Sequence, residues 1–578
     1  MMRKAILVLL ILLIPIGSLN VNSKNIVIKE TFSPKPLGKL ALVIFIDGLD
    51  VRVLNEINTP NLDYLANNGL SFSSKSVLPS STTAGTAAIA TGAYPNASGV
   101  VHTYAYNATE YHLQLPDEDP IRYYFEDMLN ATTIFETLYD KGVTTALIYT
   151  KSKQEVMLGE SGAVSKGIYV DRYNFFTVDP HEPEVTLEER EKFLEYLTNV
   201  TLDTLEQLSL LINNGQDAFL FLAYPEPDWS GHASGPNGEL YRGVVSFIDS
   251  QVGRIIDKLN ELGLWERTLI ITIADHGYSD VDPALNILNP NDEYHLPGLN
   301  VEHVVSTTAG TLLYIYLKNL SDIQKAVNQI LTYPWVGGIW TRVPAAGANG
   351  TLEDIGLNID FAGDIVLDIK PPYYASKYEN EGAHGGTDAQ NIPVILSGGA
   401  LDKTISLTSF DQLSVAPTLA YYFDADLPSK CIKDYIDVVK PSAYVTFTVK
   451  PSIVEPNSEV ELNITYKLRE NPESPKIKIE VVDSNNTIVD SKEINITDTE
   501  GNLITKVKVG AEGSHKVYVY IIDANQQILG GQANPILVAQ VEKPPRAWGK
   551  IGAAIAISLI LAVIMLALPI YLKKRKEG

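Results

Sequence analysis

Three short apolar runs stand out along the chain, and acidic residues follow each of them. The runs cover residues 41–46, 219–223 and 269–274. They are rich in branched and aromatic side chains and do not alternate with polar residues, which is typical of strands buried on both faces in a parallel sheet. Asp47 and Asp275 follow the first and third runs directly, and Asp228 comes shortly after the second.

The positions of these acidic residues indicate a shared site. Open α/β sheets bind ligands beyond the carboxyl ends of their strands, so three distant segments can deliver Asp47, Asp228 and Asp275 to one edge. Two of these segments also bring a histidine, His232 and His276. Carboxylates and imidazoles gathered in one place are suitable ligands for a divalent metal ion.

Residues 38–430 alternate strand-like and helix-like stretches, which predicts a mostly parallel α/β sheet flanked by helices. Thr59 and Pro60 mark a helix start, with threonine as the cap and proline at the first helical position. Further helices are expected at 134–140, 187–212, 240–262 and 412–423, and further strands at 144–149 and 393–397. Residues 279–378 are less regular, and we expect them to form a cap inserted over the site edge.

From residue 442 onwards, polar and apolar residues alternate between turn residues. The clearest runs are 444–449, 459–466, 476–481, 503–509 and 516–522. Alternation with a period of two predicts half-buried strands, so we expect residues 442–541 to form a small β-sandwich of immunoglobulin-like type. It carries no catalytic constellation, and we interpret it as a stalk.

Both ends of the chain are apolar. Residues 1–22 have the basic start and short apolar core of a secretory signal peptide, or of an uncleaved N-terminal anchor. Residues 551–572 are long and apolar enough to form a transmembrane helix, and the basic tail 573–578 then belongs in the cytoplasm. These features predict a single-pass protein of the cell membrane whose catalytic domain is extracellular.

Composition narrows the range of functions. The 578 residues include 69 acidic and 45 basic side chains, and the net charge is -24. Such a chain repels polyanions, so we expect no nucleic-acid-binding role. The single cysteine, Cys431, excludes an intramolecular disulfide framework. The Asn-x-Ser/Thr sites of a glycoprotein occur at Asn96, Asn107, Asn130, Asn199, Asn319, Asn349, Asn463, Asn485 and Asn495.

Residues 79–92 combine hydroxyl side chains with a run of small residues, which indicates a tight turn into a helix. Small residues let a ligand approach the backbone, and a helix N-terminus favours an anion. A hydroxyl placed there can attack phosphorus when a metal lowers its pKa. Thr82 is therefore a candidate nucleophile, although a plain helix cap is the simpler interpretation of this segment taken alone.

Six sequence elements, taken in order, point to one enzyme superfamily. They are residues 45–48, 79–82, 91–95, 224–232 with 235–236, 274–277 and 382–385. On these elements the chain resembles the alkaline phosphatase superfamily, and most of all its type I phosphodiesterase / nucleotide pyrophosphatase family. The resemblance covers residues 38–428, which is nearly the whole α/β part.

The resemblance implies two metal ions, normally zinc, each with its own ligand set. The first set would be Asp47, Asp275, His276 and Thr82, and the second would be Asp228, His232 and His384. Thr82 would also be the nucleophile. It would attack phosphorus in line and form a phosphothreonine, which water then hydrolyses.

Two positions depart from the pattern of this family. Thr83 follows the nucleophile, where the family often has an aromatic residue that stacks on the nucleobase. Thr103 stands where the family usually has an asparagine that hydrogen-bonds the phosphate. Thr103 and Tyr224 are candidates for substrate binding, although a packing role fits Tyr224 equally well. His102 could assist at the phosphate, but a surface histidine is the simpler interpretation. The remaining histidines outside the motifs are interpreted as structural: His112, His181, His295, His303 and His515.

The sequence therefore predicts an extracellular, membrane-anchored, two-zinc phosphodiesterase that acts on phosphate-ester substrates. A phosphomonoesterase or phosphonate hydrolase of the same superfamily is the nearest alternative. A catalytically inactive surface or adhesion protein is another, and transfer of a phospho-headgroup to an acceptor other than water would use the same site. A sulfatase is set aside, because the region of Thr82 has neither the cysteine nor the arginine of the sulfatase motif.

Overall fold

The computed structural model describes residues 38–113, 121–159, 166–176, 178–289, 294–439, 443–451, 453–468, 474–485, 487–524 and 528–538. The predicted signal peptide 1–22, transmembrane helix 551–572 and basic tail 573–578 lie outside these ranges. Among the residues within them, no helix is both long and apolar enough to cross a bilayer.

A seven-stranded sheet forms the centre of the α/β part. Its strands are β1 (Leu40–Ile46), β2 (Leu70–Lys75), β5 (Thr144–Tyr149), β6 (Lys166–Tyr169), β7 (Ala218–Tyr224), β8 (Thr268–Ile273) and β16 (Asn391–Ser397), in the order β2-β16-β8-β1-β7-β5-β6. β1 pairs in parallel with β7 and β8, and β5 pairs in parallel with β6 and β7. β16 is antiparallel to both of its neighbours. The sheet predicted to be mostly parallel therefore contains one reversed strand, β16, because the chain leaves β8 and re-enters the sheet at the same edge.

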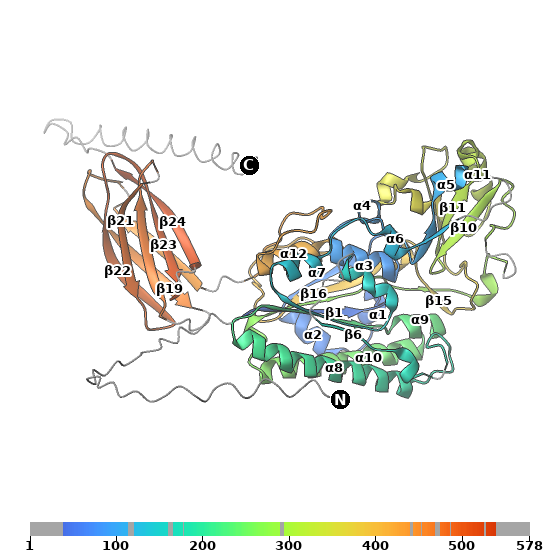
Figure 1. The fold of residues 1–578 in the computed structure, drawn as a ribbon, viewed down its shortest axis with the longest axis horizontal. Coiled ribbons are helices and arrows are strands. Elements are labelled where there is room, and N and C mark those ends of the chain that lie inside the picture. The colour runs from blue at the N-terminus through green and yellow to red at the C-terminus, as the bar shows by residue number, and fades with distance from the viewer. Residues whose placement is uncertain are drawn as a thin grey trace, which may run out of the picture.

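Helices cover both faces of this sheet (Figure 1). One face carries α2 (Pro60–Asn67), α8 (Leu187–Asn213) and α10 (Glu239–Glu261), and the other carries α3 (Thr82–Thr91), α7 (Ile134–Asp140) and α12 (Val415–Phe423). β1, β7 and β8 are consequently buried at every position, as their unbroken apolar runs predicted.

Local signals set the helix boundaries. Thr133 and Thr186 begin α7 and α8 as capping boxes, in which a threonine hydroxyl and a glutamate three residues later satisfy each other's backbone N–H groups. Pro60 occupies the first position of α2. The predicted helices at 134–140, 187–212 and 240–262 agree with the observed ones to within one residue at each end.

The shorter elements of this part connect the sheet to the site edge. They are α1 (Val51–Leu54), α4 (Pro95–Ser98), α5 (Ala108–Leu113), α6 (Phe125–Met128), α9 (Asp228–Ser234), β3 (Tyr104–Tyr106), β4 (Arg122–Tyr124) and the 3-10 helix η1 (Ser152–Leu158). β3 and β4 form a small antiparallel ribbon.

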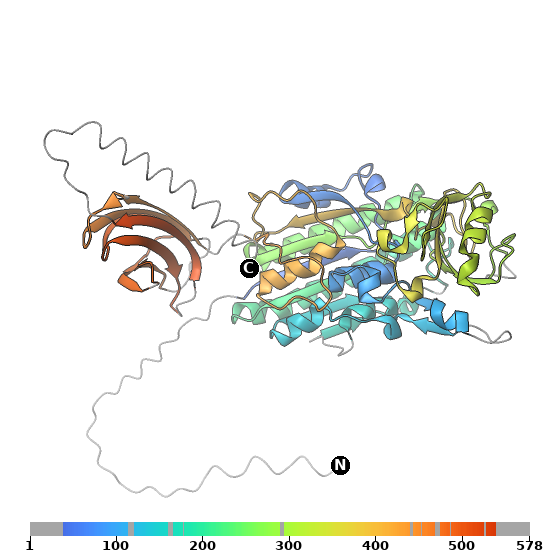
Figure 2. The same cartoon turned by 90° about the horizontal axis from the view of Figure 1, so that it is seen from above.

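The segment between β8 and β16 contains a second sheet. Its strands, in sheet order, are β10 (His303–Thr308), β11 (Leu312–Leu317), β14 (Ile365–Ile369), β12 (Val336–Thr341) and β13 (Gly350–Thr351). With α11 (Ile323–Ile330) they enclose an apolar core of their own. β9 (Ser279–Asp280) pairs with β15 (Gly382–Ala383) where the segment leaves and returns. In both views this yellow-green part lies at one end of the α/β unit (Figure 2).

Residues 443–538 form two further sheets that share one apolar core. The first contains β17 (Ala443–Lys450), β19 (Glu459–Leu468) and β22 (Glu500–Lys508), and the second contains β18 (Ile453–Val454), β24 (Ile528–Val538), β23 (Gly513–Ile522), β20 (Lys476–Val482) and β21 (Ile488–Asn495). Alternate residues of β19 and β20 are buried, as their sequence pattern predicted. β21 was not expected, because it is largely exposed and lacks that alternation.

Candidate active site at the carboxyl edge of the sheet

Three acidic side chains meet at one edge of the central sheet. Asp47 and Asp275 follow β1 and β8, and Asp228 begins α9 beyond the end of β7. The Asp47 N–H donates to the Tyr224 carbonyl (3.0 Å), and the Asp228 N–H donates to the Asp47 carbonyl (2.9 Å). All three carboxylates are buried. The backbone of adjacent strands therefore fixes their relative positions.

The turn after β1 requires a glycine. Gly48 has a φ of 77°, and a Cβ at this position would lie 2.9 Å from the Asp228 Cα. Both the positive φ and this close approach disfavour any other residue. The Gly48 N–H donates to Asp275 Oδ1 (3.0 Å). This one turn thus joins the three acidic segments.

Thr82 is the first residue of α3, and its hydroxyl faces the acidic residues. Its Oγ1 donates a hydrogen bond to Asp47 Oδ1 (3.3 Å). Every residue of α3 is buried, and a Cβ at Gly85 would lie 2.8 Å from the Asp275 Cβ. The small residues of this helix therefore allow Thr82 to reach the cluster.

Asp47, Asp275 and His276 form a first candidate metal-binding cluster. The His276 Nε2 lies 3.6 Å from Asp47 Oδ1 and 3.5 Å from Asp275 Oδ2. The Gly277 carbonyl lies 3.0 Å from His276 Nδ1, which leaves Nε2 facing the carboxylates. The Asp275 Oδ2 and His276 Nε2 atoms are buried and have no hydrogen-bond partner among the described residues. Two buried, unsatisfied ligand atoms facing each other fit a divalent cation.

Asp228 is surrounded by the histidines predicted for a second ligand set. Its Oδ1 lies 3.6 Å from the Nε2 of His232 and 3.3 Å from that of His384. Backbone carbonyls of Gly382 and Ser80 lie beside the Nδ1 atoms of these two histidines, at 3.1 and 2.8 Å. A carbonyl beside Nδ1 orients an imidazole ring so that its Nε2 can face a metal.

The second sheet holds His384 through its backbone. The His384 N–H donates to the Ala309 carbonyl (3.2 Å), and the His384 carbonyl accepts from the Thr311 N–H (2.8 Å). Ala309 and Thr311 belong to the turn that joins β10 to β11. One candidate metal ligand is therefore fixed by the segment predicted to be a cap.

The pKa values of the three buried carboxyl groups are shifted in different directions. Burial, with Asp275 as the next cause, raises the pKa of Asp47 to about 7. Burial raises the pKa of Asp275 to about 6. Burial would raise the pKa of Asp228 too, but Lys151 and His232 outweigh it and hold that pKa well below the usual range. A bound cation would relieve the cost of ionising Asp47 and Asp275.

The histidines of both clusters are held in the neutral form that binds metals. Burial, with His276 as the next cause, lowers the pKa of His384 to about 4. Burial also lowers the pKa values of His232 and His276. Neutral imidazoles beside carboxylates are the donor set that zinc prefers.

Two residues near Asp228 were missed by sequence analysis. Lys151 forms ion pairs with both Asp47 and Asp228, and the Tyr278 hydroxyl donates to Asp228 Oδ1 (2.7 Å). Lys151 comes shortly after β5 at the same edge of the sheet, which is the one sequence signal that pointed to it. Tyr278 lies two residues beyond His276 and had no signal of its own.

His181 was interpreted as structural, but it lies at the site. With Asp228 and His232 it forms a further group of potential metal ligands, and its ring centroid lies 5.4 Å from that of His232. Its Nδ1 also contacts Asp179 Oδ1. His112, in contrast, pairs with Asp364 (3.1 Å), as expected of a structural histidine.

The two predicted substrate-binding residues have other partners. Tyr224 is fully buried and shares a hydrogen bond of 2.7 Å with the hydroxyl of Thr198 on α8, so its contacts are those of a packing residue. The Thr103 hydroxyl shares a bond of 2.8 Å with Thr83. Thr103 therefore lies beside the N-terminus of α3 but is already paired.

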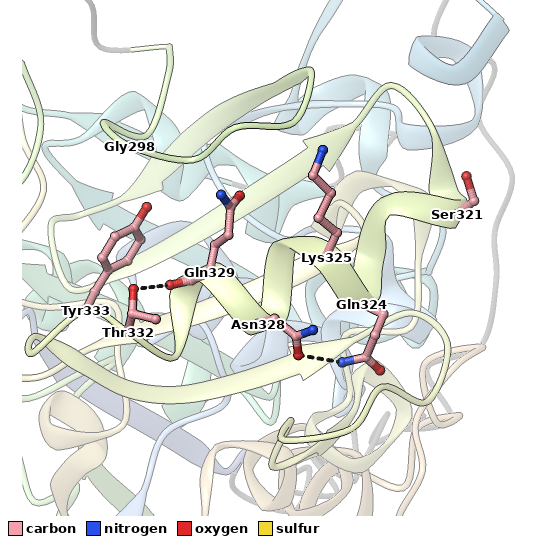
Figure 3. A pocket seen from close by; sticks show the side chains of 8 residues that line it. All are labelled: Gly298, Ser321, Gln324, Lys325, Asn328, Gln329, Thr332 and Tyr333. Atoms are coloured by element: carbon pink, nitrogen blue, oxygen red, sulfur yellow. Dashed lines mark hydrogen bonds between the residues drawn. The ribbon is translucent and has the colours of Figure 1, made fainter.

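A cavity of about 720 Å³ lies elsewhere, against α11 of the second sheet (Figure 3). Figure 3 shows polar side chains such as Gln324, Lys325 and Gln329 around it. It shares no residue with the carboxylate–histidine clusters. The candidate site at the sheet edge is therefore separate from this cavity.

The fold and this edge define a class of protein. It is an α/β protein of alkaline-phosphatase-like architecture with carboxylate–histidine clusters and a helix-terminal threonine. The sequence profile of the type I phosphodiesterase / nucleotide pyrophosphatase family matches residues 41–388. The chain belongs to this family. The family is metal-dependent, and membership supports a phosphoric ester hydrolase.

Several characterised proteins are similar to parts of the chain. Bis(5'-adenosyl)-triphosphatase ENPP4 of Pongo abelii is 28% identical over 296 residues, which cover 49% of this chain and 58% of that protein. Human ectonucleotide pyrophosphatase/phosphodiesterase family member 7 is 26% identical over 247 residues, covering 42% and 48%. The chain thus spans about half the length of these relatives. The structure of murine ectonucleotide pyrophosphatase/phosphodiesterase 5 aligns with a TM-score of 0.48 and 17% identity, covering 67% of this chain and 96% of that one.

Proposed function

We propose that this protein is a two-zinc phosphodiester hydrolase with Thr82 as its nucleophile. The observation that carries the proposal is the position of the Thr82 hydroxyl, at the start of a buried helix and 3.3 Å from Asp47 Oδ1. Asp47 belongs to the cluster in which Asp275 Oδ2 and His276 Nε2 are buried without partners. A hydroxyl beside an unsatisfied ligand set is the arrangement that metal-activated nucleophilic attack requires.

The residues would hold zinc in two sets. The first set is Asp47, Asp275, His276 and Thr82, and the second is Asp228, His232 and His384. Bound zinc supplies positive charge that lowers the pKa of an attacking oxygen and stabilises a leaving one.

The chain's own residues account for the remaining steps. Asp47 Oδ1 accepts the hydrogen bond that orients the Thr82 oxygen, and this carboxylate also receives the Thr82 proton. Formation of the Thr82 Oγ–phosphorus bond breaks the ester bond, and the departing oxygen keeps the bonding electron pair and takes up a proton. Water then cleaves the phosphothreonine, which releases the second product and restores the Thr82 hydroxyl. The burial of α3 excludes competing water from the first step.

The substrate class follows from the family and from the names of the relatives. The relative ENPP4 is named a bis(5'-adenosyl)-triphosphatase, and the other relative is named a member of the ectonucleotide pyrophosphatase/phosphodiesterase family, so nucleotide phosphoesters are the first candidates for this chain. The departure at Thr83 leaves the position next to the nucleophile without an aromatic ring. We therefore expect weaker recognition of the base than of the phosphate.

The proposal includes an anchor in the cell membrane. Residues 551–572 form an uncharged apolar run followed by basic residues, which supports a single-pass C-terminal helix with the catalytic domain extracellular. Alkaline extraction of membranes tests this. The full chain should remain in the pellet, and a chain that ends before residue 551 should be released; release of both would contradict the anchor.

Hydrolysis by the full chain tests the catalytic proposal. Bis(p-nitrophenyl) phosphate should be cleaved with added zinc, and a chelator should abolish the cleavage. Rapid acid quenching during turnover should leave phosphate on the peptide that contains Thr82, detectable by mass spectrometry. Turnover that survives complete removal of metal, or phosphate on another residue, would overturn the proposal.

A further inference from the structure

Lys151 is a buried cation shared by the two proposed ligand sets. Its Nζ lies 2.8 Å from Asp47 Oδ2 and contacts Asp228 Oδ2 still more closely. Its side chain is 6% exposed and runs past the Trp229 ring, with the Nζ 5.7 Å from the ring centroid. An ammonium held this way joins one carboxylate of each set.

Lys151 and the histidines use different oxygens of these carboxylates. Lys151 contacts Oδ2 of both Asp47 and Asp228. The Oδ1 of Asp47 faces Thr82 and His276, and the Oδ1 of Asp228 faces the histidine rings. Each carboxylate can therefore bind a metal through Oδ1 while Oδ2 stays on the lysine. The ammonium does not have to leave when the clusters are loaded.

The retained ammonium changes the charge of the loaded site. Three carboxylates and two divalent cations leave one surplus positive charge, and Lys151 makes this two. A phosphodiester carries one negative charge at the scissile phosphate, whereas a phosphomonoester or a phosphoanhydride carries more. In a buried site, such charge matching is strong because water screens it little.

A second lysine of the same turn lies near the site. Lys153 is half-buried on η1, which packs against α3. It follows Lys151 by two residues in this turn, and the pKa of His102 is lowered by burial first and by the Lys153 charge next. Within the described residues it has no hydrogen-bond or ion-pair partner. The His102 Nδ1 is likewise buried without a partner. An unpaired ammonium on the turn that carries Lys151 is suited to an anionic group.

We propose that Lys151 and Lys153 make this site select phosphoryl substrates that carry a second negative charge beside the scissile bond. The charge is either on the transferred phosphoryl group or on a phosphate bonded to it. Lys151 acts by holding the two carboxylates and adding charge, and Lys153 acts by binding the extra anionic oxygen. The inference rests on the proposed function, because it specifies the substrate of that same site.

Three substrates and three variants of the full chain test the inference. Bis(p-nitrophenyl) phosphate offers one charge, p-nitrophenyl phosphate offers two on one phosphorus, and ATP offers them on a flanking phosphate. We compare Lys151→Met and Lys153→Met with Lys192→Met, which alters an exposed lysine paired with Glu188 on α8. In both site variants, kcat/KM for one or both doubly charged substrates should fall by about tenfold relative to kcat/KM for the diester. A tenfold fall corresponds to about 1.4 kcal/mol. Loss for only one of them identifies which position of the charge is recognised.

Two measurements without turnover keep this result separate from the proposed function. Calorimetry with inorganic phosphate should show about tenfold weaker binding to zinc-loaded Lys153→Met than to wild type, and zinc content should be unchanged in both site variants. Failure of the wild type to cleave any ester would count against the proposed function only. The inference is overturned if Lys153→Met leaves both the phosphate affinity and the kcat/KM ratios between the substrates unchanged. It is also overturned if Lys151→Met loses zinc while Lys153→Met keeps the wild-type kcat/KM ratios.

Discussion

The imidazole rings of His276 and His384 stack face to face, with their centroids 3.6 Å apart and their planes 8° apart. His276 belongs to the first proposed ligand set and His384 to the second. The two sets therefore adjoin through a ring pair, and both rings are buried. Protonation of both rings would place two like charges in contact, so the arrangement requires the neutral forms that metal binding also requires.

Replacing Thr82 should separate catalysis from metal binding. Thr82→Ala removes the nucleophilic oxygen and should lower kcat by at least about 10³-fold, whereas Thr82→Ser keeps the oxygen and should retain part of the activity. Thr91→Ala is the matched control, because the Thr91 hydroxyl donates to the Ala87 carbonyl at the other end of α3. Steady-state kinetics measures the loss. Wild-type turnover by Thr82→Ala would remove Thr82 from the mechanism.

Asp275→Asn should remove one zinc ion. The unpaired Oδ2 of Asp275 would become an amide NH₂ or a weak carbonyl ligand, while Oδ1 contacts to Gly48 and His276 could persist. Zinc content by atomic spectroscopy should fall from two per chain toward one. Asp249→Asn provides the control, since Asp249 is a buried carboxyl that accepts hydrogen bonds from the Asn61 and Leu62 N–H groups at the start of α2. Two zinc ions in both variants would be evidence against the first ligand set.

Zinc affinity should depend on pH through Asp47. The pKa of this carboxyl is raised to about 7 by burial and by Asp275, so below that pH a proton must leave before a cation binds. The pKa of His384, at about 4, adds no proton competition near neutrality. Affinity should therefore fall about tenfold per pH unit below pH 7 and level off above it. Chelator competition at several pH values measures this; equal affinity at pH 6 and pH 7 is the contrary result.

Arg190 should matter for stability although it lies outside the ligand sets. It is fully buried, pairs with Glu226 and donates to the Pro180 carbonyl (2.8 Å), which ties the loop carrying His181 to the segment before Asp228. Arg190→Leu leaves Glu226 buried and unpaired, at a cost of about 3–5 kcal/mol. Denaturant titration should show this loss. Adding Glu226→Gln should recover part of it, and an unchanged midpoint in Arg190→Leu would contradict the assignment.

Tyr224→Phe distinguishes packing from substrate binding. The tyrosine hydroxyl bonds only to Thr198 among the described residues, so its removal should cost about 1 kcal/mol of stability. KM for any ester should stay at the wild-type value. A several-fold rise in KM with unchanged stability would restore the interpretation of Tyr224 as a substrate contact.

The parts of the site that could be predicted are those whose position depends on strands. Asp47 and Asp275 follow apolar runs directly, and parallel pairing then places them at one edge. The strands that precede these two residues were predicted as well, because fully buried strands have unbroken apolar sequences. The reversed strand β16 could not be foreseen in this way, since its direction depends on where the second sheet returns the chain.

Residues that reach the site from loops left little trace in the sequence. Lys151 had only its position after β5 as a signal and His181 had none, so it is their three-dimensional neighbours that reveal a role. Tyr224 is the opposite case. Its position at the end of β7 is correct for a site residue, but side chains alternate along a strand, and this one points to α8.

The backbone bonds between His384 and the turn at 309–311 limit how the second sheet can move. A swing of that sheet away from the central one would carry a ligand of the second set with it, so access to the site and retention of its metal are thermodynamically coupled. Amide exchange across β10 and β11 should slow when zinc is added. If the second sheet were replaced by that of a relative in order to alter specificity, the turn at 309–311 would have to be preserved. Without it, we expect the second ligand set to lose its metal.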